Sequence, residues 1–122
     1  MSGFRYWGYH LILDCKNGDL EKVRDGDNIT AFVKALVNTI DMVSYGDPVV
    51  EHFATHIPDA AGYSLVQLIE TSSITGHFVD IDGDCYIDIF SCKPFDIDMA
   101  KSVVQKFFEP DQMRVTYLTR QA

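Results

Sequence analysis

Residues 73–92, SITGHFVDIDGDCYIDIFSC, decide the fold of this chain. Two runs rich in apolar, β-branched and aromatic residues, 73–81 and 85–92, flank the pair Asp82-Gly83. Asp-Gly is favoured in the tight turn of a β-hairpin, because that turn needs a positive φ at its central positions. The stretch therefore predicts two antiparallel strands joined by a short turn.

More strands and two helices are predicted around this hairpin. Apolar or aromatic runs next to turn residues predict strands at 6–15, 49–57, 63–70 and 113–119. The clearest helical pattern has Asn28 as its N-cap and apolar residues every three or four positions from Ile29 to Val43, and a second helix is predicted at 96–108. This order predicts an α+β fold, a two-layer sandwich with a mostly antiparallel sheet and both helices on one face, in a single domain of residues 1–122. The other sheet face is free for a ligand or a partner.

Composition and charge exclude several classes of function. A formal net charge of −8 and a pI near 4.7 oppose a nucleic-acid footprint, which needs a basic face, and are compatible with cationic ligands. No apolar stretch reaches the roughly 18 residues of a membrane span, and the N-terminus lacks a signal-peptide pattern. Three cysteines without metal-type spacing indicate reduced thiols. We expect a cytoplasmic protein that binds neither nucleic acids nor membranes.

The segment IETSSITGHF, residues 69–78, places hydroxyls and a histidine between apolar flanks. Such hydroxyls are either a satisfied polar edge of the sheet or the surroundings of a reactive serine. Two metal patterns nearby are incomplete: DIDGD at 80–84 lacks the spacing of a calcium loop, and His52 and His56, on one side of a predicted strand, lack further zinc ligands. We therefore expect no metal site.

The spacing of four residues indicates a chemical role for these hydroxyls. Ser64 lies eight positions before Ser72, and His77 lies five after it. Cys92 follows His77 by fifteen positions. With this spacing the chain resembles the small, prokaryotic-type S-adenosylmethionine decarboxylases, which make a pyruvoyl cofactor from an internal serine. The opening GYHLILDCKNGD, residues 8–19, is also similar to the first strand of that family.

The resemblance implies a proenzyme that cleaves itself between Thr71 and Ser72. The Ser72 hydroxyl would attack the Thr71 carbonyl, and the resulting ester would break by β-elimination to leave the ketone of a pyruvoyl group at position 72. By resemblance, His77 is the base and Ser64 stabilises the oxyanion. The substrate amine would form a Schiff base with the ketone, the electron sink for decarboxylation, and Cys92 would return a proton to the α-carbon.

The resemblance also suggests a substrate, a product and an assembly. S-adenosylmethionine would lose carbon dioxide to become the aminopropyl donor for spermidine synthesis. Glu70 and Tyr63 are candidate substrate-binding residues, and adenine needs an aromatic stack, for which the candidates are Phe4, Tyr6, Trp7, Phe53 and Tyr63. If Trp7 does not stack on adenine, we interpret it as a packing residue of the core or of an interface. The family forms homodimers with sites near the interface, and we expect the same here.

Departures from the family pattern leave alternatives open. The family usually has Glu before the reactive serine, where this chain has Thr71, and Glu70 is displaced by one position. Ser73 stands where a histidine is typical, and FVDIDGD at 78–84 replaces a TWPE-like segment. Related pyruvoyl enzymes decarboxylate arginine or ornithine, cations that an acidic protein accepts readily. A pyruvoyl-dependent arginine or ornithine decarboxylase, or an unprocessed non-catalytic homologue, is therefore an alternative.

Overall fold

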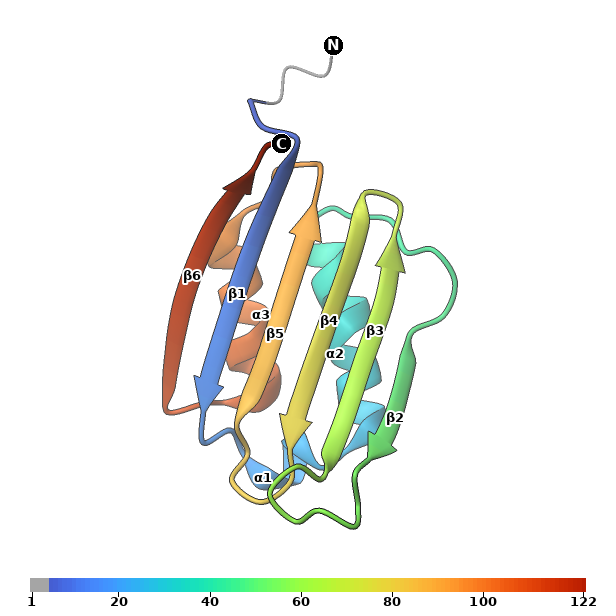
Figure 1. The fold of residues 1–122 in the computed structure, drawn as a ribbon, viewed down its shortest axis with the longest axis vertical. Coiled ribbons are helices and arrows are strands. Elements are labelled where there is room, and N and C mark those ends of the chain that lie inside the picture. The colour runs from blue at the N-terminus through green and yellow to red at the C-terminus, as the bar shows by residue number, and fades with distance from the viewer. Residues whose placement is uncertain (1–4) are drawn as a thin grey trace.

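A computed structural model describes residues 5–122 of the chain as one antiparallel sheet covered on one side by helices (Figure 1). The strand order across the sheet is β2-β3-β4-β5-β1-β6. The elements, in chain order, are β1 (Gly8–Lys16), α1 (Leu20–Val23), α2 (Gly26–Thr39), β2 (Val49–Phe53), β3 (Gly62–Ile69), β4 (Ser72–Val79), β5 (Cys85–Ser91), α3 (Ile97–Phe108) and β6 (Gln112–Arg120). The predicted α+β two-layer sandwich is confirmed.

The predicted hairpin forms as β4 and β5. Phe78 pairs with Cys85 next to the turn, and Ser72 pairs with Ser91 at the other end of the two strands. Gly83 has a φ of +81°, and a Cβ at this position would lie 2.3 Å from the carbonyl oxygen of Gly18. The turn therefore needs glycine both for its backbone conformation and for the close approach of residue 18.

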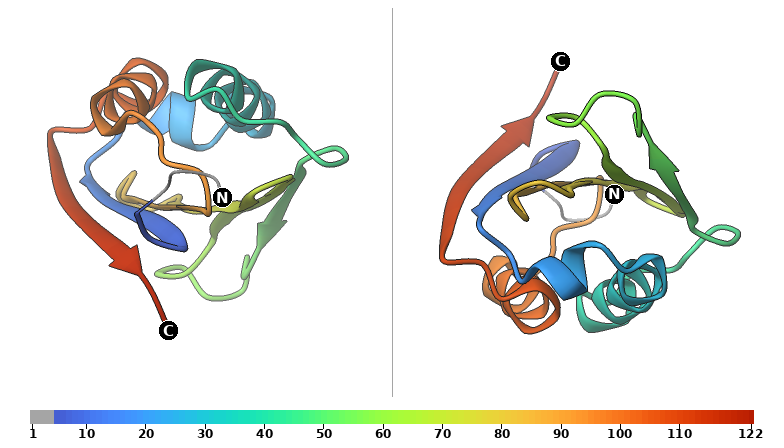
Figure 2. Two further views of the ribbon diagram at one scale, coloured as in Figure 1. Left: turned by 90° about the horizontal axis from the view of Figure 1, so that it is seen from above. Right: turned by 90° about the horizontal axis from the view of Figure 1, so that it is seen from below.

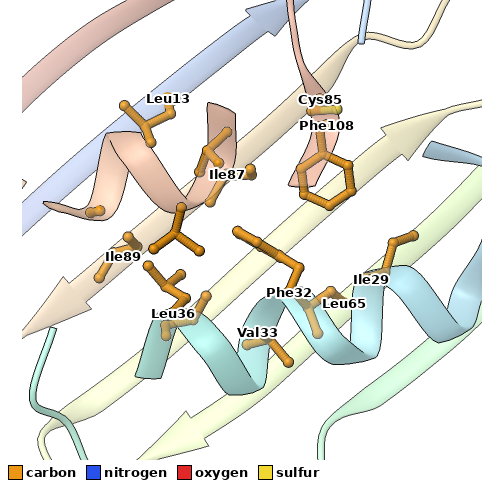
Figure 3. Packing of buried hydrophobic residues seen from close by; sticks show 14 of the residues in the cluster. Leu13, Ile29, Phe32, Val33, Leu36, Leu65, Cys85, Ile87, Ile89 and Phe108 are labelled. Carbon is orange, nitrogen blue, oxygen red and sulfur yellow. The ribbon is translucent and has the colours of Figure 1, made fainter. Parts of the chain in front are cut away.

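All three helices lie on the same side of the sheet, as both end views show (Figure 2). Their apolar stripes pack against alternate residues of the strands, because successive strand side chains point to opposite faces. Phe32 of α2 lies at the centre of this core, with its ring centroid 4.8 Å from that of Phe108 and 6.4 Å from that of Phe78 (Figure 3). Within residues 5–122, no helix combines the length and apolar character needed to cross a membrane.

Several predicted boundaries are wrong. Helix α2 is capped by the side chain of Asp25 rather than by Asn28, whose amide instead bonds the carbonyl oxygens of Lys22 and Phe107. The helix ends at Thr39, four residues before the predicted Val43, since Asp41 turns the chain with a φ of +59°. The short helix α1 was not predicted at all.

The strand predicted at 49–57 ends at Phe53. Ala54 has a φ of +57°, which takes the chain out of the sheet, so His56 lies in the following loop. The prediction that His52 and His56 share one side of a strand is therefore wrong. The imidazole Nε2 of His52 instead pairs with a carboxylate oxygen of Asp80 at 2.6 Å.

The side of the sheet without helices is here called the open face. Its central residues are Ser64, Val66 and Leu68 on β3, Ser73, Thr75 and His77 on β4, and Tyr86, Asp88 and Phe90 on β5. Apolar side chains on this face are exposed: Leu68 keeps 51% of its surface accessible and Val66 keeps 43%. The open face is thus a polar and apolar mixture with no cover within the described chain.

Candidate active site

The predicted cleavage junction, Thr71-Ser72, lies in the tight connection between β3 and β4. Only Glu70 and Thr71 separate the two strands, and Ser72 pairs with Ile69 as the hairpin closes. Ser72 has a φ of +154°, a value that residues with a side chain rarely adopt. Strained backbone of this kind persists only where the surrounding structure imposes it, and it is common at reactive sites.

The carbonyl group of Thr71 is held by the neighbouring strand end. Because β5 runs antiparallel to β4, the residue that follows β5 lies beside the junction, and the main-chain N–H of Cys92 donates to the Thr71 carbonyl oxygen at 2.9 Å. On the other side, the N–H of Glu70 donates to the carbonyl oxygen of Val43 at 2.9 Å. A donor aimed at a carbonyl can stabilise negative charge that develops on its oxygen.

The side chain of Thr71 is also fixed. Its hydroxyl accepts a hydrogen bond of 2.8 Å from the hydroxyl of Ser91, which is completely buried. The Ser91 oxygen in turn accepts from the N–H of Lys93 at 3.0 Å, and the Thr71 hydroxyl donates to the sulfur of Met42 at 3.4 Å. Sequence reasoning missed Ser91, since only the strand register brings it beside the junction.

Ser64 and His77 form a pair of their own on the open face. They are directly opposite on β3 and β4, and the Ser64 hydroxyl and His77 Nδ1 share a hydrogen bond of 3.0 Å. His77 lies five residues further along β4 than Ser72, which at about 3.3 Å per residue is a separation of about 16 Å. One copy of the chain therefore brings Ser64 to His77 and Cys92 to Thr71, but it does not bring the two groups together.

The three cysteines differ sharply in their surroundings. Cys15 and Cys85 are buried opposite each other on β1 and β5, and both are free thiols. Burial, with the nearby Asp14, raises the pKa of Cys15 to about 12, and burial followed by the charges of Cys15 and two aspartates raises the pKa of Cys85 further. Cys92 is only partly buried. Of the three, it is the cysteine that is not buried and that lies beside the junction.

The two predicted substrate-binding residues lie apart. Glu70 is exposed in the β3–β4 connection next to the junction. Tyr63 is near the opposite end of β3, where its ring packs 4.8 Å from that of His52 and lies close to Gly26 of α2, since a Cβ at position 26 would be 3.0 Å from the ring. Within one copy of the chain Tyr63 therefore lies far from the junction, and its role in substrate binding stays a prediction.

An aromatic cleft of about 420 Å³ lies near the junction, lined by Trp7, Phe90, Arg120, Gln121 and Ala122. The Trp7 and Phe90 rings lie 6.0 Å apart, and the Arg120 guanidinium lies 5.3 Å above Phe90. Phe90 pairs directly with Ser73, the residue after the junction. This position on the open face was not anticipated for Phe90, because the register of β5 against β4 is not readable from the sequence.

The other predicted stacking residues are elsewhere. Tyr6 packs edge-on against Tyr9 with centroids 6.2 Å apart, Phe53 is on the edge strand β2, and Phe4 lies outside the described residues. Among residues 5–122, no group of three or more histidine, cysteine or acidic side chains is placed to hold a metal ion.

Comparison with known proteins identifies the fold first. The structure matches the crystal structure of the adenosylmethionine decarboxylase from Aquifex aeolicus VF5 with a TM-score of 0.80 over 98% of this chain and 94% of that chain, at 17% sequence identity. The sandwich is thus an adenosylmethionine decarboxylase-like fold. The sequence model of the S-adenosylmethionine decarboxylase family matches residues 9–121, and the chain belongs to that family, whose members are in general pyruvoyl-dependent. No curated protein sequence matches the chain.

Proposed function

We propose that the chain is the proenzyme of an S-adenosylmethionine decarboxylase that generates its own pyruvoyl group from Ser72 and supplies the aminopropyl donor for spermidine synthesis. The observation that carries this proposal is the junction itself, where a strained Ser72 follows a Thr71 carbonyl held at 2.9 Å by the N–H of Cys92. A cytoplasmic location with reduced thiols is part of the same proposal.

Self-cleavage would begin with addition of the Ser72 Oγ to the carbonyl carbon of Thr71. Negative charge develops on the carbonyl oxygen, where the Cys92 N–H stabilises it. The C–N bond then breaks, the Ser72 nitrogen takes the proton given up by the hydroxyl, and an ester joins the two residues. A base removes the α-proton of Ser72, the ester leaves as the Thr71 carboxylate, and hydrolysis of the dehydroalanine releases ammonia and leaves the ketone.

The base for the elimination step would come from a second copy of the chain. His77, with Ser64 bonded to it, is about 16 Å from Ser72 of the same chain at the usual rise of a strand, too far for proton transfer. Ser64 and His77 lie on the open face, which carries exposed apolar residues across the sheet: Val49, Phe53, Val66, Leu68, Tyr86 and Leu118. A face of this kind favours contact with another protein surface. We therefore propose a homodimer through the open face, in which each site combines residues of both copies.

The proposed pyruvoyl group would supply an electron sink for the electron pair left when the substrate loses carbon dioxide. The chain's own residues must then deliver one proton to the α-carbon. Cys92 is suited to this role, because it is adjacent to the junction and partly accessible while Cys15 and Cys85 are buried. Its main-chain N–H and its thiol would thus serve different steps.

Replacing Cys92 by alanine should separate those two steps. Alanine keeps the main-chain N–H, so we expect the junction to be cut at nearly the parent rate. Without the thiol, decarboxylation should fall by about a hundredfold, the usual scale for loss of a positioned acid. Cleavage is followed by intact mass and turnover by release of labelled carbon dioxide. Parent-like turnover of the variant would remove Cys92 from the mechanism.

The aromatic cleft favours S-adenosylmethionine over arginine or ornithine as the substrate. Its Trp7 and Phe90 rings offer faces for the adenine ring, and aromatic faces also attract a sulfonium cation. Through Phe90 and Ser73 the cleft adjoins the residue that would carry the ketone. A basic amino acid can place its cation on an aromatic face, but it has no ring to stack in the cleft.

The substrate is tested by offering carboxyl-labelled S-adenosylmethionine, arginine and ornithine in parallel. We expect carbon dioxide from S-adenosylmethionine alone. Because stacking of a base on an aromatic ring is worth about 1–3 kcal/mol, Trp7→Ala should raise KM about ten- to hundredfold, with self-cleavage unchanged and with Trp7→Phe close to the parent. Release from arginine or ornithine would assign the chain to a different decarboxylase, and no release from any of the three would favour a non-catalytic homologue.

A further inference from the structure

The residue before the cleaved bond is held by its side chain as well as by its main chain. An unbroken hydrogen-bonded series runs from the N–H of Lys93 to Ser91 Oγ, from the Ser91 hydroxyl to Thr71 Oγ1, and from the Thr71 hydroxyl to the Met42 sulfur. Each hydroxyl in the series both donates and accepts. The orientation of the Thr71 side chain is therefore defined at both ends.

The burial of Ser91 favours one conformation of the Ser91–Thr71 pair. Ser91 has no accessible surface, so its hydroxyl cannot turn to water if Thr71 moves away. The Ser91 hydroxyl also lies 3.7 Å from the Met42 sulfur, a weak acceptor, so loss of the Thr71 partner would leave it with a poorer hydrogen bond, and the observed conformation is favoured. Threonine is β-branched and has few side-chain rotamers, so fixing its hydroxyl also fixes the backbone that carries its carbonyl group.

Fixing the Thr71 side chain also orients the Thr71 carbonyl carbon, which Ser72 would attack. The carbonyl oxygen of Thr71 receives the Cys92 N–H from the same short segment, residues 91–93, that holds the side chain. Two independent contacts from one segment thus orient a single residue next to the strained Ser72. Attack on a carbonyl requires a defined approach, and a displacement of about 1 Å can lower a rate by about a hundredfold.

We propose that Ser91 is a positioning residue for self-cleavage, acting through the Thr71 hydroxyl to hold the Thr71 carbonyl carbon for attack by Ser72 Oγ. The proposal rests on the proposed function, since it concerns the first step of pyruvoyl formation. It also gives a role to threonine at a position where the family usually has glutamate: the hydroxyl of Thr71 is the group that Ser91 holds.

A double-mutant cycle on Ser91 and Thr71 tests this role. Ser91→Ala and Thr71→Val each remove one hydroxyl of the pair, and each should slow the first-order loss of the intact chain about ten- to hundredfold. Because both act through one contact, the double variant should be no slower than the slower single variant. Thr71→Ser keeps the hydroxyl but not the β-branch, and it should cleave faster than Thr71→Val.

A second readout separates the acyl shift from the elimination. At neutral pH hydroxylamine cuts an ester much faster than a peptide bond, and its slower cut at Asn17-Gly18 gives fragments of a different mass, so the fraction of chain that yields the fragment ending at Thr71 reports the ester at position 72. We expect this fraction to fall in Ser91→Ala and Thr71→Val, whereas a variant with a blocked elimination step should accumulate it. Cys85→Ala, at the opposite end of β5 and equally buried, is the matched control for a general loss of packing and should cleave like the parent.

Three results would overturn the positioning role: parent-like rates in Ser91→Ala or Thr71→Val, independent losses that multiply in the double variant, or an equal loss in Cys85→Ala. If the parent chain neither shortens nor yields a hydroxylamine-sensitive ester, the proposed function itself is wrong. The role of Ser91 is then refuted with it.

Discussion

Replacing Ser72 by alanine is expected to abolish self-cleavage completely, because no other hydroxyl can form the ester that breaks the bond after Thr71. Ser73→Ala is the matched control: it removes a hydroxyl one residue away, on the open face, and should leave cleavage intact. Folding of both variants is checked by circular dichroism and thermal unfolding, and cleavage by intact mass.

The opposite pattern, with Ser73→Ala uncut and Ser72→Ala cut, would shift the reactive residue by one position. The proposed roles of Thr71 and Ser91 would then be wrong as well, since both depend on cleavage before Ser72. Cleavage in both single variants would exclude an ester mechanism at this junction.

The second large effect is expected from mixing two inactive chains. Ser72→Ala lacks the nucleophile, and His77→Ala lacks the base, whose loss should slow elimination by about a hundred- to ten-thousandfold. If each site combines Ser72 of one copy with His77 of the other, a mixed dimer contains one complete site. In that dimer the His77→Ala chain should be cut, because its Ser72 meets the histidine of its partner.

Co-expression with two different affinity tags, followed by sequential purification and mass analysis, measures this directly. The control partner carries both Ser72→Ala and His77→Ala and should give no rescue. Rescue confined to the His77→Ala chain supports the composite site. A His77→Ala chain that cleaves unaided, or one that stays intact in verified mixed dimers, would contradict it.

Local signals were enough to predict most of the fold. Asp82-Gly83 predicted the β4–β5 hairpin, and the apolar spacing within residues 96–108 predicted α3 to within one residue of its observed start. The start of α2 was misplaced because Asp25 and Asn28 are both good N-cap residues, and the tertiary contacts of Asn28 with Lys22 and Phe107 decide between them. Helix α1 has only four residues, too few for a periodic pattern.

The candidate site could be predicted only in part. Resemblance pointed to the residue types at positions 64, 72, 77 and 92, but strand register decides which of them meet. Pairing of Ser72 with Ser91 brings the Cys92 N–H and the Ser91 hydroxyl to Thr71, and pairing of Ser73 with Phe90 brings the aromatic cleft alongside. Long-range pairing of this kind leaves no local signal in a single sequence, so Ser91 and Phe90 were missed.

The intact mass of freshly purified parent chain, followed over days under conditions in which it stays folded, tests self-processing most directly. We predict that one species of 122 residues is replaced by two, residues 1–71 with a free carboxylate and residues 72–122 beginning with a pyruvoyl group. The second fragment should react with a carbonyl reagent such as a hydrazide. A single unbroken chain that retains serine at position 72, even after prolonged incubation, would contradict the proposed function.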